Sequence, residues 1–277
     1  MNNQSKKTVI KAASVLAVLC ASANAELITV NIENTMAGDS FFLTPFWIGV
    51  HNGGFDTYDS GAMASEFSGL TELAETGNTS PLSGAFSSSA AGAAGGAQAT
   101  VTAVGFSGDA PVFSPGESTS FNLDVGDSTV NQYFSFASMV IPSNDLFISN
   151  GNPNAYQIFD AAGNFNGNTV IEIYGRDVND NGTEVNSAAN DAAFSANDGQ
   201  SLPEFALIRN LFTDANDGAY LDSFIGSGTA NGATIGSSFG ADDLIARITI
   251  TQVPAPSGAA ILLGSSVMLF RRRRAHS

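Results

Sequence analysis

The sequence predicts an all-β protein, an antiparallel β-sandwich with long loops and one short helix. Three observations lead to this prediction. Polar and apolar residues alternate in several short segments, clusters of Gly, Asn, Asp, Ser and Pro separate these segments, and no break in composition divides the body of the chain. Because alternation gives a strand one apolar face, such strands bury that face by packing as two sheets.

The predicted elements follow in chain order. Alternation predicts strands over residues 27–32, 121–125, 170–174 and 244–250. Residues 61–75 repeat apolar side chains at helical spacing, which predicts the one helix. Residues 83–100 consist almost wholly of Ser, Gly and Ala, a composition typical of a flexible loop.

The N-terminus has the pattern of a secretory signal peptide. Lys6, Lys7 and Lys11 precede a short apolar run, and Ala23-Asn24-Ala25 follows as a cleavage site, so residues 1–25 are interpreted as the signal. The only cysteine, Cys20, lies inside it. The exported body, residues 26–252, therefore has no disulfide, and its hydrophobic core has to hold it together.

The C-terminus, residues 253–277, resembles the PEP-CTERM class of bacterial sorting signals. Val253-Pro254-Ala255-Pro256 is followed by an apolar stretch and by four arginines, 271–274. The resemblance implies a segment that lies transiently in the inner membrane and is a substrate of an exosortase. It also implies delivery to the cell surface or extracellular matrix of a Gram-negative-type bacterium. The alternative is a membrane anchor that is retained, although the apolar run is short for a full span.

The body carries a strong negative charge. It holds all 26 acidic residues of the chain against three basic ones, Arg176, Arg209 and Arg247, which leaves a formal net charge of −23. Such a surface repels nucleic acid and anionic lipid. The charge fits a well-solvated protein and identifies no ligand.

Residues 175–186 begin like a calcium-binding EF-hand loop. Asp177, Asn179 and Asn181 alternate and Gly182 follows, but Ala188 stands where the closing glutamate is required. In that frame the stretch does not complete a site, and a polar turn without metal remains the alternative.

A series of short motifs resembles the spondin domain, the N-terminal module of F-spondin and mindin that also occurs in bacterial exported proteins. The series covers roughly residues 27–190. Its members, in chain order, are Val30-Asn-Ile-Glu-Asn34, Trp47-Ile-Gly-Val-His51, Leu70-Thr-Glu-Leu-Ala-Glu-Thr-Gly77, Pro115-Gly-Glu-Ser118, Ser138-Met-Val-Ile-Pro-Ser-Asn-Asp-Leu-Phe147 and Asp180-Asn-Gly-Thr-Glu184. The disulfides of the animal relatives are absent, and residues 83–100 read as an insertion.

The resemblance implies a calcium ion held between two loops. Carried over by position, its ligands are Asp145, Asp180 and Glu184. The chemistry agrees, because Ca²⁺ prefers carboxylate, carbonyl and water oxygens. Gly182 permits a tight turn between Asp180 and Glu184, and a divalent cation offsets the repulsion of clustered carboxylates.

Other chemistry has little support in the sequence. His51 is the only histidine of the body, so a nucleophile–histidine device has one possible base, and a structural role at a strand end is the simpler interpretation. No catalytic residues are assigned. The expected function is a non-enzymatic, calcium-binding adhesion module that binds an extracellular protein or polysaccharide. The alternative is a secreted hydrolase that acts on polysaccharide through carboxylates not singled out by any motif.

Overall fold

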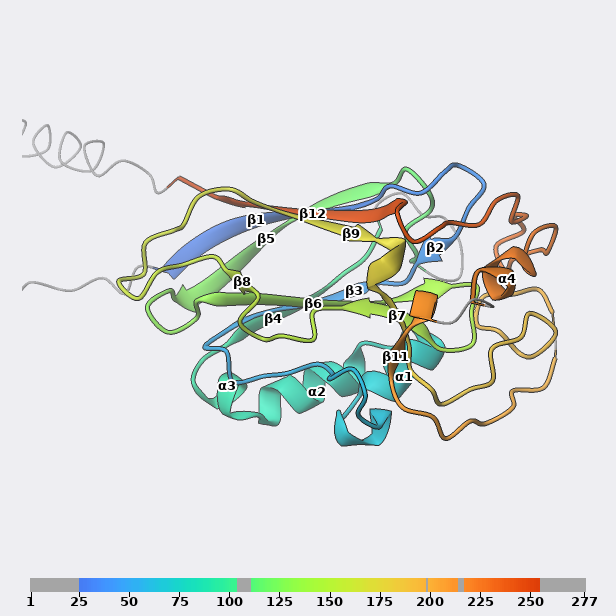
Figure 1. The fold of residues 1–277 in the computed structure, drawn as a ribbon. Coiled ribbons are helices and arrows are strands. Elements are labelled where there is room, and N and C mark those ends of the chain that lie inside the picture. The colour runs from blue at the N-terminus through green and yellow to red at the C-terminus, as the bar shows by residue number, and fades with distance from the viewer. Residues whose placement is uncertain (1–24, 104–110, 198, 214–216, 255–277) are drawn as a thin grey trace, which may run out of the picture.

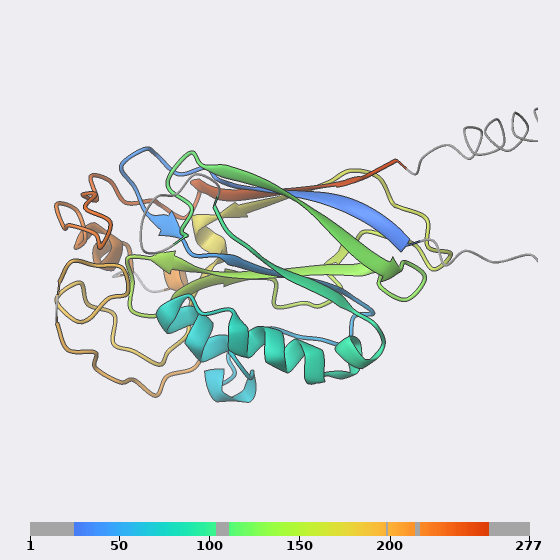
Figure 2. The ribbon, with the colours of Figure 1, turned by 180° about the vertical axis from the view of Figure 1, so that it is seen from behind.

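The protein is an antiparallel β-sandwich, which confirms the predicted fold class. The computed structural model describes residues 25–103, 111–197, 199–213 and 217–254. Two sheets face each other, and helices cover the outer face of the larger sheet (Figure 1). Seen from behind, the same three layers appear: small sheet, large sheet, helices (Figure 2).

The small sheet has the strand order β5-β1-β12-β9. Its members are β1 (Ala25–Asn34), β5 (Ser118–Asp127), β9 (Thr169–Tyr174) and β12 (Leu244–Gln252). Each contains one of the four segments predicted from alternation. Ile28, Val30 and Ile32 are buried on the inner face of β1, and the residues between them are partly exposed on the outer face.

The large sheet has the order β11-β10-β7-β6-β3-β4, with β2 and β8 also paired to β6. Its strands are β2 (Phe42–Leu43), β3 (Phe46–His51), β4 (Ala97–Val101), β6 (Tyr133–Ile141), β7 (Leu146–Ser149), β8 (Tyr156–Gln157), β10 (Val178–Asp180) and β11 (Arg209–Asn210). Strand β3 is buried on both faces, because the small sheet covers one and the helices cover the other.

The helical segments are short. They are η1 (Ala64–Glu66), α1 (Leu70–Thr76), α2 (Ser80–Ser88), α3 (Ala90–Ala93), η2 (Gly175–Asp177), η3 (Leu211–Thr213) and α4 (Asp217–Asp222). The single helix expected over residues 61–75 is therefore two elements, η1 and α1. Gly69, with a φ of +85°, interrupts them, because this left-handed backbone conformation cannot continue a right-handed helix.

The prediction of a flexible loop over residues 83–100 is wrong. This segment contains most of α2, all of α3 and the edge strand β4. Pro81 fits the first turn of α2, where its missing N–H costs nothing. Leu82 and Phe86, four residues apart, bury the same face of the helix.

A second apolar cluster lies between the helices and the large sheet. Trp47 is at its centre, fully buried, with its ring centroid 5.5 Å from that of Phe86. The indole Nε1 donates to Oε1 of Gln98 at 2.7 Å, so the one polar atom of this side chain is satisfied. The composition of residues 83–100 does not predict this packing, because most of their side chains are small and only Leu82 and Phe86 anchor α2.

The predicted signal peptide and sorting segment lie almost wholly outside the described residues. The structure therefore leaves both as predictions. Within the described ranges, no helix is both long enough and apolar enough to cross a membrane.

Candidate metal centre

Strand pairing brings Asp145 and Asp180 together. Asp145 immediately precedes β7, and Asp180 ends β10. These strands are antiparallel neighbours in which Asp180 lies opposite Leu146, so the two carboxylates belong to adjacent chain segments at one end of the sheet. Both residues are buried, with 0% and 1% of their surfaces exposed.

One oxygen of Asp145 ties the turn after β10 to the turn before β7. Oδ2 accepts hydrogen bonds from the backbone N–H groups of Thr183 at 2.8 Å and Glu184 at 3.1 Å, and from the Thr183 hydroxyl at 3.2 Å. The other oxygen, Oδ1, is buried without a hydrogen-bond partner. A buried acceptor of this kind costs free energy unless something binds it.

Asp180 is held in place by both of its oxygens. Oδ1 accepts from the N–H of Gly182 at 2.8 Å, and Oδ2 accepts from Asn186 Nδ2 at 2.7 Å and from Arg209 at 2.8 Å. Gly182 has a φ of +70°, and a Cβ there would lie 2.7 Å from the carbonyl oxygen of Ala206. The turn therefore requires glycine on two grounds, conformation and space.

Two amide side chains near these aspartates also keep an oxygen without a partner. Asn181 Nδ2 donates to Thr183 Oγ1 at 3.0 Å and Asn186 Nδ2 donates to Asp180. Their Oδ1 atoms, like that of Asp145, are buried without a hydrogen bond. The cluster thus holds three unpartnered hard oxygen atoms, the donor type that Ca²⁺ prefers. The sequence prediction did not include either asparagine among the ligands.

The electrostatics of the pair favour a bound cation. Burial, and then the neighbouring Asp180 carboxylate, raise the pKa of Asp145 far above its usual range, and the N–H donors of Glu184 and Thr183 oppose that rise only in part. A cation beside the pair would stabilise the ionised form of both carboxylates and so oppose the rise in pKa.

Glu184 occupies a different position from the two aspartates. Its backbone N–H binds Asp145, but its half-buried carboxylate accepts a hydrogen bond from the Ser201 hydroxyl. Burial raises the pKa of Glu184, and the nearby carboxylates Glu75 and Asp191 raise it further. Within the described part of the chain, no three acidic, histidine or cysteine side chains converge as a metal-binding group. The structure therefore brings together Asp145 and Asp180 but not the Glu184 carboxylate.

Asp177 and Asn179, the first positions of the EF-hand-like pattern, lie outside the cluster of Asp145 and Asp180. Asp177 Oδ2 accepts from the N–H of Tyr174 at 2.8 Å, and Asn179 Nδ2 donates to the Tyr58 hydroxyl at 3.0 Å. Both side chains line a separate cavity. Asn179 and Asp180 project from opposite faces of β10, because successive side chains of a strand alternate. Asp177 precedes the strand, as the last residue of η2.

His51 is a buried structural histidine. Its Nδ1 accepts from the N–H of Gly53 at 3.0 Å, so Nε2 carries the proton and donates to Ser135 Oγ at 2.9 Å. Burial lowers the pKa of His51 to about 4. With both nitrogens engaged inside the core, this imidazole is not placed to serve a solvent-accessible catalytic site.

No protein-family model matches the chain, and no curated protein is significantly similar to it.

Proposed function

We propose that this protein is an exported, non-enzymatic module of a bacterial cell surface or extracellular matrix, and that a calcium ion stiffens it. The observation that supports the metal most directly is the buried, unpartnered Oδ1 of Asp145 beside a second buried aspartate, Asp180. The resemblance to spondin domains, with Asp145, Asp180 and Glu184 as ligands, supports the same assignment. The export and sorting signals support the location.

The proposed ion would bind Oδ1 of Asp145 and a carboxylate oxygen of Asp180. Glu184 would join by exchanging its bond to Ser201 for the ion, and the amide oxygens of Asn181 and Asn186 are further candidates. An ion bound in this way would link two segments distant in sequence, the turn at Asp145 and the turn over residues 180–186. Since the exported body has no cysteine, such a link would replace the disulfides of related extracellular domains.

The test is thermal unfolding of the exported protein in calcium and in EDTA, at matched ionic strength so that screening of the negative surface is constant. A ligand that binds only the folded state adds about 1.4–2.7 kcal/mol at ten- to a hundredfold excess over Kd. For a domain of this size, that range raises the melting temperature by roughly 3–10 °C.

Asp145→Asn and Asp180→Asn should remove most of the calcium response, and Glu184→Gln should reduce it. Asp177→Asn is the matched control, because Asp177 lies in the same segment but outside the cluster. Equal melting temperatures in the two buffers, with no calcium in elemental analysis, would overturn the metal centre.

A further inference from the structure

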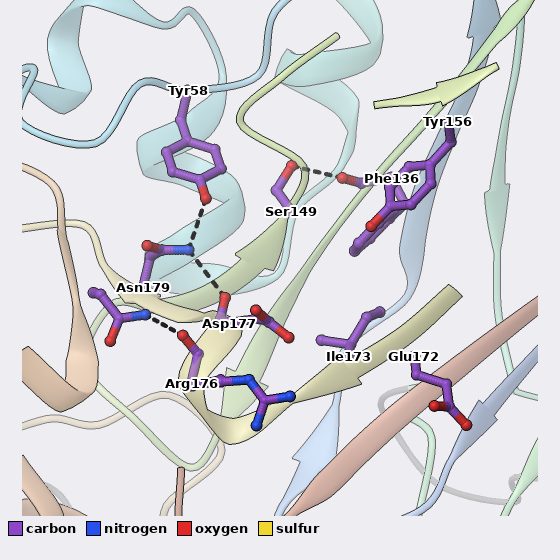
Figure 3. A pocket seen from close by; sticks show the side chains of 10 residues that line it. Tyr58, Phe136, Ser149, Tyr156, Glu172, Ile173, Arg176, Asp177 and Asn179 are labelled. Atoms are coloured by element: carbon purple, nitrogen blue, oxygen red, sulfur yellow. Dashed lines mark hydrogen bonds between the residues drawn. The ribbon is translucent and has the colours of Figure 1, made fainter. Parts of the chain in front are cut away.

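A cavity of about 260 Å³ opens beside the metal centre, at the free edge of the sandwich. It lies between β9 of the small sheet and the part of the large sheet where β6 changes partner (Figure 3). Its lining residues are Tyr58, Phe136, Ser149, Tyr156, Glu172, Ile173, Arg176, Asp177, Asn179 and Asn210.

The change of partner along β6 makes room for the cavity. Tyr133 and Phe134 pair with β8, and β7 pairs only from Ala137 onwards. At Phe136 side chains replace the missing strand: its N–H donates to Asn150 Oδ1 at 2.9 Å, and its carbonyl accepts from Ser149 Oγ at 2.6 Å. The N–H and carbonyl of Phe136 are therefore hydrogen-bonded without a neighbouring strand, so leaving the space beside β6 open costs little free energy.

Two fixed acceptors face this space. Oδ2 of Asp177 accepts a hydrogen bond from the N–H of Tyr174, and Oδ1 makes no hydrogen bond within the described residues. Asn179 donates through Nδ2 to the Tyr58 hydroxyl and to the carbonyl of Asp177, at 3.0 and 3.1 Å. This fixes the amide and leaves Oδ1 of Asn179 as an acceptor.

Two hydroxyl donors complete the ring around the cavity. Figure 3 shows the Tyr58 and Tyr156 hydroxyls directed inward from two sides, with the Asp177 carboxylate between them. Tyr58 is braced by Phe147, at a centroid distance of 5.1 Å, and Tyr156 lies beside Phe136 at 6.3 Å. Burial raises the pKa of both tyrosines and Asp177 raises it further, so both hydroxyls keep their protons at neutral pH.

The charge of the cavity comes from Asp177. Arg176 stacks on Tyr174 at 4.2 Å and pairs with Asp242 at 2.9 Å. Glu172 accepts from the Tyr174 hydroxyl at 2.9 Å and lies 3.4 Å from the Arg247 guanidinium. Because these charges are paired and the body is strongly acidic, an anionic ligand is disfavoured.

We propose that this cavity binds one neutral or positively charged sugar residue of an extracellular polysaccharide, held by Asp177, Asn179, Tyr58 and Tyr156. Each sugar hydroxyl both donates and accepts hydrogen bonds, which matches a site with two fixed acceptors and two hydroxyl donors beside aromatic rings. A simple ammonium group only donates, and would leave the tyrosine protons unused. This inference rests on the proposed role as a surface or matrix module and names its ligand class.

The test is titration of the full exported chain, in calcium, with glucose, galactose, mannose and glucosamine, followed by calorimetry and saturation-transfer NMR. At least one of these sugars should bind with a Kd on the order of 1 mM. Glucuronic acid and n-butylammonium should bind at least about tenfold more weakly, through charge repulsion and through missing acceptors respectively.

Two variants test whether the sugar binds in the cavity. Tyr156→Phe removes one hydroxyl, and Asp177→Asn removes the charge while keeping an acceptor for Tyr174, and each should weaken binding about tenfold. Tyr133→Phe is the matched control, since Tyr133 does not line the cavity, and should bind normally.

Three results would overturn the inference: none of the four sugars binds, n-butylammonium binds better than all of them, or both cavity variants bind normally. These results are separate from the tests of the proposed function. A melting temperature that is the same in calcium and in EDTA would overturn the metal centre alone. Release of reducing ends from an oligosaccharide would overturn the non-enzymatic role alone.

Discussion

Asn179 and Asp180 are neighbours on β10, yet they belong to regions of opposite physical character. Asp180 lies in a sealed cluster in which two buried carboxylates meet and acceptor oxygens lack partners. Asn179 lines an open cavity in which both acidic groups, Asp177 and Glu172, are exposed. A carboxylate without water around it requires a cation or a proton, whereas a hydrated one is free to bind a polar ligand. The difference between the regions is therefore one of solvation more than of composition.

The largest expected effect compares an aspartate from each region. Asp145→Ala should lower the free energy of unfolding by about 3 kcal/mol, because it leaves the partly buried N–H donors of Thr183 and Glu184 without an acceptor. Asp177→Ala removes one hydrogen bond at the surface and should cost only about 0.5–1 kcal/mol. Urea unfolding of both variants in calcium measures the difference. Equal losses would mean that the cluster is not the stabilising region.

The next effect concerns the arginine that already pairs with Asp180. Arg209→Gln should cost roughly 1–2 kcal/mol in EDTA, because the guanidinium at 2.8 Å offsets part of the buried negative charge. In saturating calcium the loss should shrink, since the ion supplies that positive charge. Urea unfolding in the two buffers gives both values.

The matched control for Arg209 is Arg176→Gln. Arg176 pairs with Asp242, whose side chain is 96% exposed, and such a pair contributes little. A loss for Arg209→Gln that is the same with and without calcium would show that the guanidinium and the ion do not share a role.

Part of this arrangement could be predicted from the sequence. The strands of the small sheet were predictable because each has one solvated face, so that residues such as Ile28 and Val30 alternate with polar ones. The helices over residues 83–100 were missed because their stability comes from Leu82 and Phe86 packing against Trp47, and not from composition. Tertiary contacts of this kind leave only a weak local pattern.

The two proposed sites also differ in how far the sequence predicts them. The order of motifs predicts Asp145 and Asp180 as metal ligands, and the pairing of β7 with β10 places these two residues on neighbouring segments. The cavity has no local signal, because Tyr58, Phe136 and Tyr156 come from segments that meet only through the change of partner along β6. The sequence does offer Asn181, within the predicted turn, and Asn186, just after it, and both carry the oxygen type that calcium binds.

A smaller effect is expected on the tyrosines. Burial raises the pKa of Tyr58 and Tyr156, and the Asp177 carboxylate raises it further, so Asp177→Asn should lower the pKa of both tyrosines. Unfolded tyrosines lose their protons near pH 10 and these two do so later, so above that pH the unfolded chain binds fewer protons and stability falls as pH rises. The variant should lose less stability over that range.

Spectrophotometric titration of phenolate absorbance measures these shifts among the five tyrosines of the chain. Asp124→Asn is the control, because Asp124 is exposed on β5 and does not line the cavity. An unchanged titration curve for Asp177→Asn would mean that the carboxylate does not face the two hydroxyls.

The smallest expected effect is coupling between the regions. Although Asn179 and Asp180 are adjacent, β10 is held on both edges by β7 and β11, and Asn179 is fixed by Tyr58. Calcium should therefore change the Kd for sugar by no more than about twofold, the size expected for sites whose side chains have different partners. The measurement is sugar titration in calcium and in EDTA, at a temperature where the protein is folded in both buffers. Reciprocity requires that sugar shift the calcium affinity by the same factor, so calcium titration with and without sugar is an internal check. A tenfold change in both directions would show instead that β10 is a two-state element, and that the sealed and open regions act as one site.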